Sequence, residues 1–249
     1  MSAEAFTRTT TSRPIVAALD VLAPGGSSTL VTLGDSLTDG FQAGPLGFPE
    51  TPATIDTDQR FPDFLRRRLE SAARPIAVSN AGISGNRLLT NGVPLYGRSA
   101  LERLDADVLA RAGVTDVLVF EGINDIGQVS AASASALADG YREVVARLHA
   151  RGLHVLHATL TPAGRSRTSG YSGAAGRATR NAVNDWIRAE SPADAVVDLD
   201  AAVRDPADPD VIDARFDGGD GLHLNADGYA RLADAIDLSL LRGADCAAP

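Results

Sequence analysis

The sequence predicts an α/β fold in which a parallel sheet is built from βαβ units. From residue 29 onwards, short apolar runs alternate with amphipathic helical patterns, which is the order of elements in such units. The apolar runs are continuous along the chain, as expected for strands that are buried on both faces. No internal repeat and no shift in composition marks a second domain within the 249 residues.

Each apolar run predicts one strand, and each amphipathic stretch predicts one helix. The clearest helix covers residues 134–151, because five apolar side chains fall on one stripe at helical spacing and Gly152 follows as a stop signal. That stripe is expected to face the core. The predicted strands are residues 29–33, 76–79, 116–120, 154–159 and 195–199. The predicted helices are residues 62–73, 100–112, 134–151, 179–190 and 226–241.

Two predicted loops, residues 40–60 and 161–176, are long for a compact domain. Loops of this length are often binding loops or lids, although both also fit plain surface insertions. In an open α/β sheet the ligand site lies beyond the carboxyl ends of the strands. Polar residues directly after the strands are therefore the first candidates for a functional site.

Both ends of the chain are expected to lie outside the folded domain, which we place at residues 14–243. Residues 1–13 are polar and rich in Thr, as in a disordered tail or linker, and they contain no apolar signal segment. Residues 244–249 form a second tail with the single cysteine, Cys246. One cysteine cannot form an internal disulfide, so the compartment is not indicated and a secreted origin stays open.

Charge and hydropathy exclude several classes of partner. A formal charge of −9 and a pI near 4.9 argue against nucleic acid, because binding depends on basic side chains that neutralise phosphates. The longest apolar runs are too short to cross a bilayer. All 23 basic residues are Arg, which excludes Schiff-base chemistry and a Lys-activated serine. We expect a monomer that acts on a small-molecule or carbohydrate substrate.

Polar blocks follow the first two predicted strands. Gly34-Asp35-Ser36-Leu37 comes after the first, where a serine at a strand-to-loop turn can expose its hydroxyl beside backbone N–H groups. The block from Asn80 to Asn86 comes after the second, and its glycines allow unusual backbone angles and a close approach to a ligand. Either block alone also fits an ordinary turn.

Two more blocks follow the third strand and precede the last helix. Gly122-Ile123-Asn124-Asp125 offers a neutral side-chain amide, which suits a developing oxyanion but also suits an Asx-turn or helix cap. Asp220-Gly221-Leu222-His223 spaces a carboxylate three residues from an imidazole, so that the carboxylate can fix the tautomer of the ring.

The four blocks, in this order and at strand ends, resemble the SGNH/GDSL hydrolase superfamily from about residue 30 to residue 241. The resemblance implies a flavodoxin-like, three-layer α/β/α sandwich with a parallel five-stranded sheet and with neither a metal nor an organic cofactor. It implies that Ser36 attacks the acyl carbon, that His223 acts as general base and then general acid, and that Asp220 orients His223. The implied oxyanion hole consists of the backbone N–H groups of Ser36 and Gly85 and the side-chain amide of Asn124.

The chain is also similar to a bacterial GDSL subgroup with an Arg-Phe/Trp-Pro helix start, here Arg60-Phe61-Pro62. One departure is Gly221, where many relatives in that subgroup have His. We expect this glycine to loosen the loop around His223. Asp35 is assigned to holding the turn before Ser36.

Other classes of protein fit these residues less well. No Gly-x-Ser-x-Gly elbow occurs, so a member of the α/β-hydrolase fold is excluded. A metal hydrolase built on His223 and the aspartates nearby lacks a second histidine, and His154 and His157 point to opposite faces of one strand. A carbohydrate-binding module on the same fold would be expected to lack Ser36 or His223.

The predicted function is a serine esterase acting on carboxylic esters with short acyl chains. A carbohydrate O-acetyl esterase and a lysophospholipase-like or thioesterase-like acyl hydrolase remain alternatives. The long loops lack the apolar character of a lipid groove, and a total aromatic content of 5% gives few platforms for a sugar chain.

Overall fold

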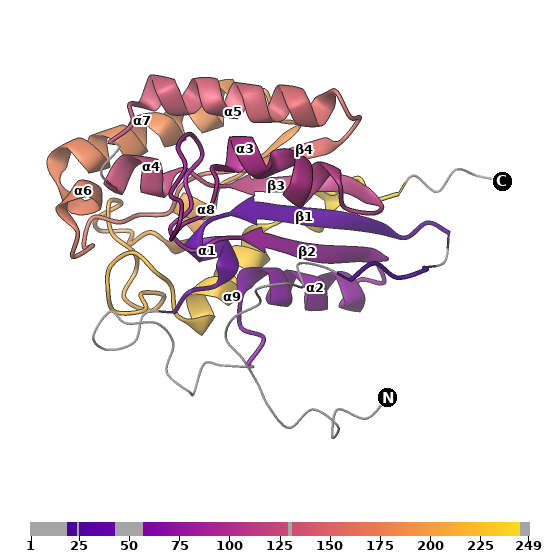
Figure 1. The fold of residues 1–249 in the computed structure, drawn as a ribbon. Helices are drawn as coiled ribbons and strands as arrows, with labels where there is room; N and C mark the ends of the chain where they lie inside the picture. Colours follow the sequence, from indigo (N-terminus) through magenta and orange to yellow (C-terminus); the bar gives the residue numbers. More distant parts are fainter. Residues whose placement is uncertain (1–18, 24, 43–56, 129–130, 245–249) are drawn as a thin grey trace.

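Five parallel strands form one sheet in the computed structural model, which describes residues 19–23, 25–42, 57–128 and 131–244. The strand order is β2-β1-β3-β4-β5, so β1 lies between β2 and β3 (Figure 1). This is the flavodoxin-like order, and the predicted α/β sandwich is confirmed. The strands are β1 (Ser28–Gly34), β2 (Ile76–Gly82), β3 (Val114–Phe120), β4 (His154–Ala158) and β5 (Ala195–Val197).

Helices cover both faces of the sheet (Figure 1). Alternate residues of β3 supply the two cores: Val117 and Val119 pack with α3, α5 and α7, while Leu118 and Phe120 pack with α2 and α9. The burial of every position in the second half of β3 explains its continuous apolar sequence. These helices are α2 (Phe61–Ser71), α3 (Ala100–Leu104), α5 (Ala134–His149), α7 (Ala174–Glu190) and α9 (Ala226–Ala235).

Several predicted boundaries differ from the structure, and three of the differences have a clear local cause or form. The predicted strand 195–199 ends at Val197, because the Asp198 carboxylate accepts from the Ala201 N–H and starts the short helix α8 (Leu199–Val203). The last helix ends at Ala235, and the Asp237 side chain starts a separate 3₁₀ turn (Leu238–Leu240). Helix α3 continues from its own end as a π-helical segment (Asp105–Leu109).

Three further short helices were not predicted, because four or five residues are too few to show helical periodicity. They are α1 (Ser36–Asp39), α4 (Ile123–Gly127) and α6 (Ser169–Ser172). The prediction of a long unstructured loop at residues 161–176 is therefore wrong, since this stretch holds α6 and the first turn of α7. Most of the other predicted loop, residues 43–56, lies outside the described residues.

The predicted tails lie almost entirely outside the part of the chain that the structure describes, including residues 1–18, Cys246 and the rest of 245–249. The division into a domain at residues 14–243 and two tails thus stays a prediction. Among the described helices, none is long and apolar enough to cross a membrane.

Candidate active site

The site begins at the carboxyl end of β1, where the chain turns sharply into α1. The Asp35 carboxylate accepts from the Leu37 N–H at 2.9 Å and caps the helix, so its predicted role in the turn is confirmed. Gly34 permits this turn, because a Cβ there would overlap the Thr38 side chain and the Phe120 carbonyl. Ser36 is the first residue of α1, and its N–H belongs to the first turn, whose amides have no acceptor within a helix.

Three side chains form one hydrogen-bonded row, in the order Ser36, His223 and Asp220. In the sequence, 187 positions separate Ser36 from His223. The Ser36 Oγ lies 2.9 Å from His223 Nε2, and His223 Nδ1 lies 2.7 Å from Asp220 Oδ2. A carboxylate beside Nδ1 keeps the proton on that nitrogen, which leaves Nε2 free to accept the serine proton. The structure therefore brings together the three residues that the sequence predicts as nucleophile, base and orienting acid.

The Asp220 carboxylate is held by three interactions with its own loop. Oδ2 faces the imidazole, while Oδ1 accepts from the backbone N–H groups of Leu222 and His223. Partial burial alone would raise the pKa of Asp220, but the hydrogen bond and charge of His223 and these two N–H groups lower it to about 2. The carboxyl is therefore ionised at any pH at which an esterase would be assayed.

Gly221 does not leave this loop without contacts, so the expectation of a loosened loop is wrong. Its N–H donates to Asp217 Oδ1 at 3.1 Å. Its φ of +72° favours glycine, and a Cβ would overlap the backbone of Arg165. The segment around Arg165 thus occupies the space that a side chain at position 221 would need.

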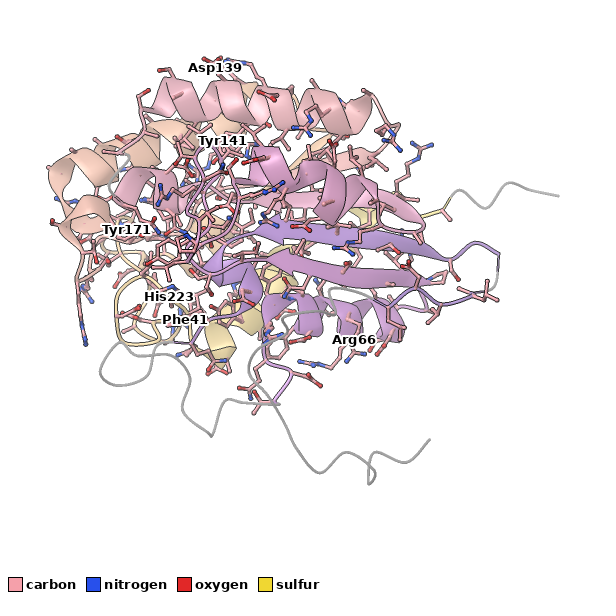
Figure 2. All side chains as sticks on the ribbon, viewed as in Figure 1. Phe41, Arg66, Asp139, Tyr141, Tyr171 and His223 are labelled. Carbon is pink, nitrogen blue, oxygen red and sulfur yellow. The ribbon has the colours of Figure 1, made fainter. Side chains whose placement is uncertain are left out.

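Phe41 packs against the imidazole, with 4.5 Å between the ring centroids of Phe41 and His223. The Phe41 N–H donates to the Ser36 carbonyl, and the Phe41 carbonyl accepts from the Tyr229 hydroxyl. Figure 2 shows Phe41, His223 and Tyr171 at the same end of the sheet. Phe41 is not predicted as a site residue, because no motif distinguishes it from other residues of its loop.

The two other predicted oxyanion donors follow β2 and β3, the neighbours of β1. Gly85 has a φ of +77°, and a Cβ there would overlap the Tyr96 ring, so glycine is required. Asn124 lies in α4 and is 3% exposed; its Nδ2 donates to the Asn86 carbonyl at 2.8 Å. One Nδ2 hydrogen of Asn124 is thereby used, and the other is available to a ligand.

Arg103 of α3 connects the segments that carry Ser36 and Gly85. This guanidinium, 5% exposed, donates to the carbonyl of Gly34 at 3.0 Å, to the carbonyl of Ala81 at 2.7 Å and to Asn86 Oδ1 at 2.9 Å. It therefore fixes the ends of β1 and β2 and the turn after Gly85 relative to one another. An arginine on a helix gives no sequence signal of this role, because most helical arginines face water.

Two buried carboxyls lie with Arg103 beneath the site. Burial raises the pKa of Asp35 to about 7, against the opposing effects of the Leu37 N–H and the charges of His223 and Arg103. Burial, and then the charge of Asp35, also raise the pKa of Glu121. Raised pKa values keep these carboxyls protonated to higher pH, which limits the negative charge beside a developing oxyanion.

The aspartate and histidine side chains of the alternative metal site have other partners. Asp217 Oδ1 accepts from the N–H groups of Gly219 and Gly221, which is a turn role. His154 binds the Leu240 carbonyl, whereas His157 packs against Tyr141 on the opposite face, as predicted for residues three apart on a strand. In the described ranges no three His, Cys, Asp or Glu side chains lie close enough to hold a metal ion.

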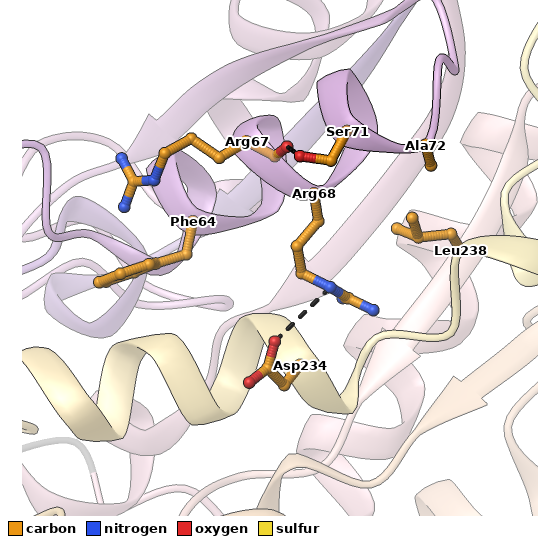
Figure 3. Close-up of a pocket in the computed structure, with 7 residues that line it drawn as sticks. All are labelled: Phe64, Arg67, Arg68, Ser71, Ala72, Asp234 and Leu238. Carbon is orange, nitrogen blue, oxygen red and sulfur yellow. Dashed lines mark hydrogen bonds and ion pairs between the residues drawn. The ribbon is translucent and has the colours of Figure 1, made fainter.

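A separate surface hollow lies between α2 and α9, lined by Phe64, Arg68, Asp234 and neighbouring residues (Figure 3). Arg68 spans it, with its guanidinium donating to the Ala233 and Ile236 carbonyls and lying 3.6 Å from Asp234. These polar groups are paired with one another. The packing of α2 against α9 therefore accounts for the hollow. None of the residues that line it belongs to the row at Ser36.

The protein has a parallel α/β/α sandwich, and hydrogen bonds join a serine, a histidine and an aspartate at the carboxyl edge of its sheet. This combination places the protein among hydrolases of this architecture. The chain belongs to the GDSL-like lipase/acylhydrolase family, whose model matches residues 32–231. The predicted resemblance is confirmed. Among curated protein sequences, none is significantly similar to this chain.

Solved structures of esterases share the fold at low sequence identity. Est24, a carbohydrate acetylesterase from Sinorhizobium meliloti, is 19% identical with a TM-score of 0.63, over 84% of this chain and 96% of Est24. The native M. smegmatis aryl esterase is 17% identical with a TM-score of 0.64, over 84% and 96% of the two chains. A GDSL-like lipase from Bacteroides thetaiotaomicron is 17% identical with a TM-score of 0.60, over 86% and 87%.

Proposed function

We propose that the protein is a serine esterase that hydrolyses carboxylic esters through an acyl-enzyme. The observation that carries this proposal is the hydrogen-bonded row of Ser36 Oγ, His223 Nε2, His223 Nδ1 and Asp220 Oδ2, at 2.9 and 2.7 Å. Distances of this size allow the imidazole to take the serine proton directly. The catalytic unit in this proposal is residues 14–243, acting as a monomer.

The proposed reaction has two halves. In the first, Ser36 Oγ bonds to the acyl carbon as its proton passes to His223 Nε2, and His223 then returns that proton to the leaving alcohol oxygen. In the second, a water molecule gives a proton to His223 and attacks the acyl carbon, which releases the acid and restores Ser36. In both halves the carbonyl oxygen carries negative charge, which the Ser36 N–H, the Gly85 N–H and the Asn124 amide stabilise.

The surroundings of Gly85 favour an ester with an apolar acyl group. Tyr96 lies against Gly85, and its loop exposes Val93 and Leu95. Exposed apolar side chains beside a catalytic edge suit an apolar substituent better than a long sugar chain. A carbohydrate O-acetyl esterase is the second candidate, because Est24 carries that description on the same fold.

The test is an ester panel of p-nitrophenyl acetate through palmitate, with acetylated sugars, on the full chain. We expect kcat/KM to be highest for the short acyl chains, and we expect EDTA to leave the activity unchanged. Ser36→Ala should lower the rate by about 10⁴- to 10⁶-fold without a loss of folding, because the substitution removes one hydroxyl oxygen and keeps the Cβ. More than about a tenth of wild-type activity in that variant would assign the chemistry to another residue.

A further inference from the structure

An asparagine in an oxyanion hole must present its nitrogen, because its oxygen would repel the developing negative charge. The two ends of the amide have almost the same shape, so packing alone does not choose between them. We infer that Tyr171 is a positioning residue that fixes the orientation of the Asn124 amide in the oxyanion hole. This inference rests on the proposed esterase function.

Two hydrogen bonds hold opposite ends of the Asn124 amide. The Tyr171 hydroxyl donates to Asn124 Oδ1 at 2.7 Å, and Asn124 Nδ2 donates to the Asn86 carbonyl at 2.8 Å. With Oδ1 engaged by Tyr171 and one Nδ2 hydrogen engaged by Asn86, the second Nδ2 hydrogen is the group left for a ligand.

The reversed amide is disfavoured because the side chain of Asn86 is anchored by three hydrogen bonds, which keep the backbone carbonyl of this residue facing Asn124. Asn86 Oδ1 accepts from Arg103 Nε at 2.9 Å, and its Nδ2 donates to the carbonyls of Tyr96 and Arg98, both at 2.7 Å. In the reversed orientation, Asn124 Oδ1 would face this fixed carbonyl oxygen, leaving two acceptors together without a proton. Asn86 therefore selects the orientation, and Tyr171 holds the amide in it.

The close packing of α6 against α4 brings Tyr171 to Asn124. Tyr171 is 8% exposed and lies over Gly127, where any Cβ would overlap the tyrosine ring. Gly170 in turn lies against the Gly127 carbonyl, where a Cβ would also overlap. Burial raises the pKa of Tyr171, so the phenol keeps its proton and remains a donor over the working pH range.

The experiment is a double-mutant cycle of Tyr171→Phe and Asn124→Ala, measured as kcat and KM on one soluble ester. Tyr171→Phe removes one hydroxyl and should lower kcat by about 3- to 10-fold with KM changed less than about twofold. In the Asn124→Ala background the same substitution should have no further effect on kcat, because the amide that it orients is gone. A boronic acid, whose tetrahedral adduct places an oxygen in the hole, should bind Tyr171→Phe more weakly by the same factor as the loss in kcat.

Two controls separate positioning from a general structural effect. Tyr141→Phe removes another buried hydroxyl, whose partner is the Glu121 carbonyl, and kcat should stay within about twofold of wild type. The pH at which kcat/KM rises should be the same in Tyr171→Phe as in wild type, because the row at His223 is intact.

An equal loss of kcat in both backgrounds, an effect on KM alone, or a wild-type kcat in Tyr171→Phe would overturn the inference. Each of these results leaves the esterase proposal standing as long as Ser36→Ala is inactive. Activity retained in Ser36→Ala would instead reject the esterase proposal itself.

Discussion

The sequence leaves two roles open for Asp220: a turn residue before the last helix, or the partner of the imidazole. In the structure Asp220 has both roles. The structure shows that one oxygen serves each: Oδ1 accepts from the loop backbone, and Oδ2 faces His223 Nδ1. Because the pKa of Asp220 is lowered to about 2, the carboxylate is present throughout the pH range of an assay. A fixed anion beside an imidazole stabilises its protonated form.

Asp220→Asn should therefore change the pH dependence of the reaction as well as its rate. The imidazolium loses its anionic neighbour, so the pH at which kcat/KM rises should move to lower pH, while kcat falls by about 10³- to 10⁴-fold. The measurement is a pair of pH–rate curves for wild type and variant on one soluble ester.

Asp217→Asn is the matched control for that experiment. Asp217 holds the same loop through Gly219 and Gly221, so this variant should lose stability without moving the inflection. If the inflection of Asp220→Asn is also unmoved and its kcat is near normal, Asp220 does not belong to the row and Asp217 becomes the next candidate.

At the scale of elements, the site is assembled by short helices that each follow a strand. Helix α1 begins two residues after the last residue of β1, and α4 begins three residues after the last residue of β3, which places Ser36 and Asn124 at adjacent strand ends. The strand ends were predictable, because apolar runs mark the strands and the polar blocks come directly after them. The contacts of Tyr171 and Arg103 were not, because each joins elements that are distant in the sequence.

Burial also changes the pKa of a histidine in strand β4, His157. This ring is 1% exposed, packs against Tyr141 and binds Ser191 Oγ through Nδ1 at 2.8 Å. Burial lowers the pKa of His157 to about 3, whereas a histidine in the unfolded chain titrates near ~6.5. Between these values the unfolded state binds the extra proton, so His157 makes the fold lose stability as pH falls from about 6.5 to about 3.

His157→Asn should remove this part of the acid sensitivity. At pH 4 the contribution of His157 to the free energy of unfolding is lower by about 3 kcal/mol than at neutral pH, so the variant should show a flatter dependence on pH in denaturant titrations. Ser191→Ala keeps the titrating ring and should keep the wild-type slope. Equal slopes in wild type and His157→Asn would show that this ring is not a source of acid sensitivity.

At the scale of the whole molecule, sequence and structure agree on architecture and differ in the details that surround the site. The parallel sheet and its two helical layers follow from the alternation of buried runs and amphipathic stretches, a pattern that persists over the whole domain. Phe41 beside the imidazole and the Arg165 backbone beside Gly221 depend on how loops fold back over the sheet edge. Such contacts have no local pattern in the sequence.

The most direct test of the central claim is covalent labelling of the whole protein with a fluorophosphonate, followed by peptide mapping. We expect one adduct, on Ser36, with parallel loss of ester hydrolysis, because Ser36 Oγ pairs at 2.9 Å with a histidine whose other ring nitrogen faces a carboxylate, Asp220. Ser36→Ala should take up no label, and His223→Ala should be labelled much more slowly. An adduct on another serine, or a Ser36 adduct that leaves hydrolysis unchanged, would contradict the account.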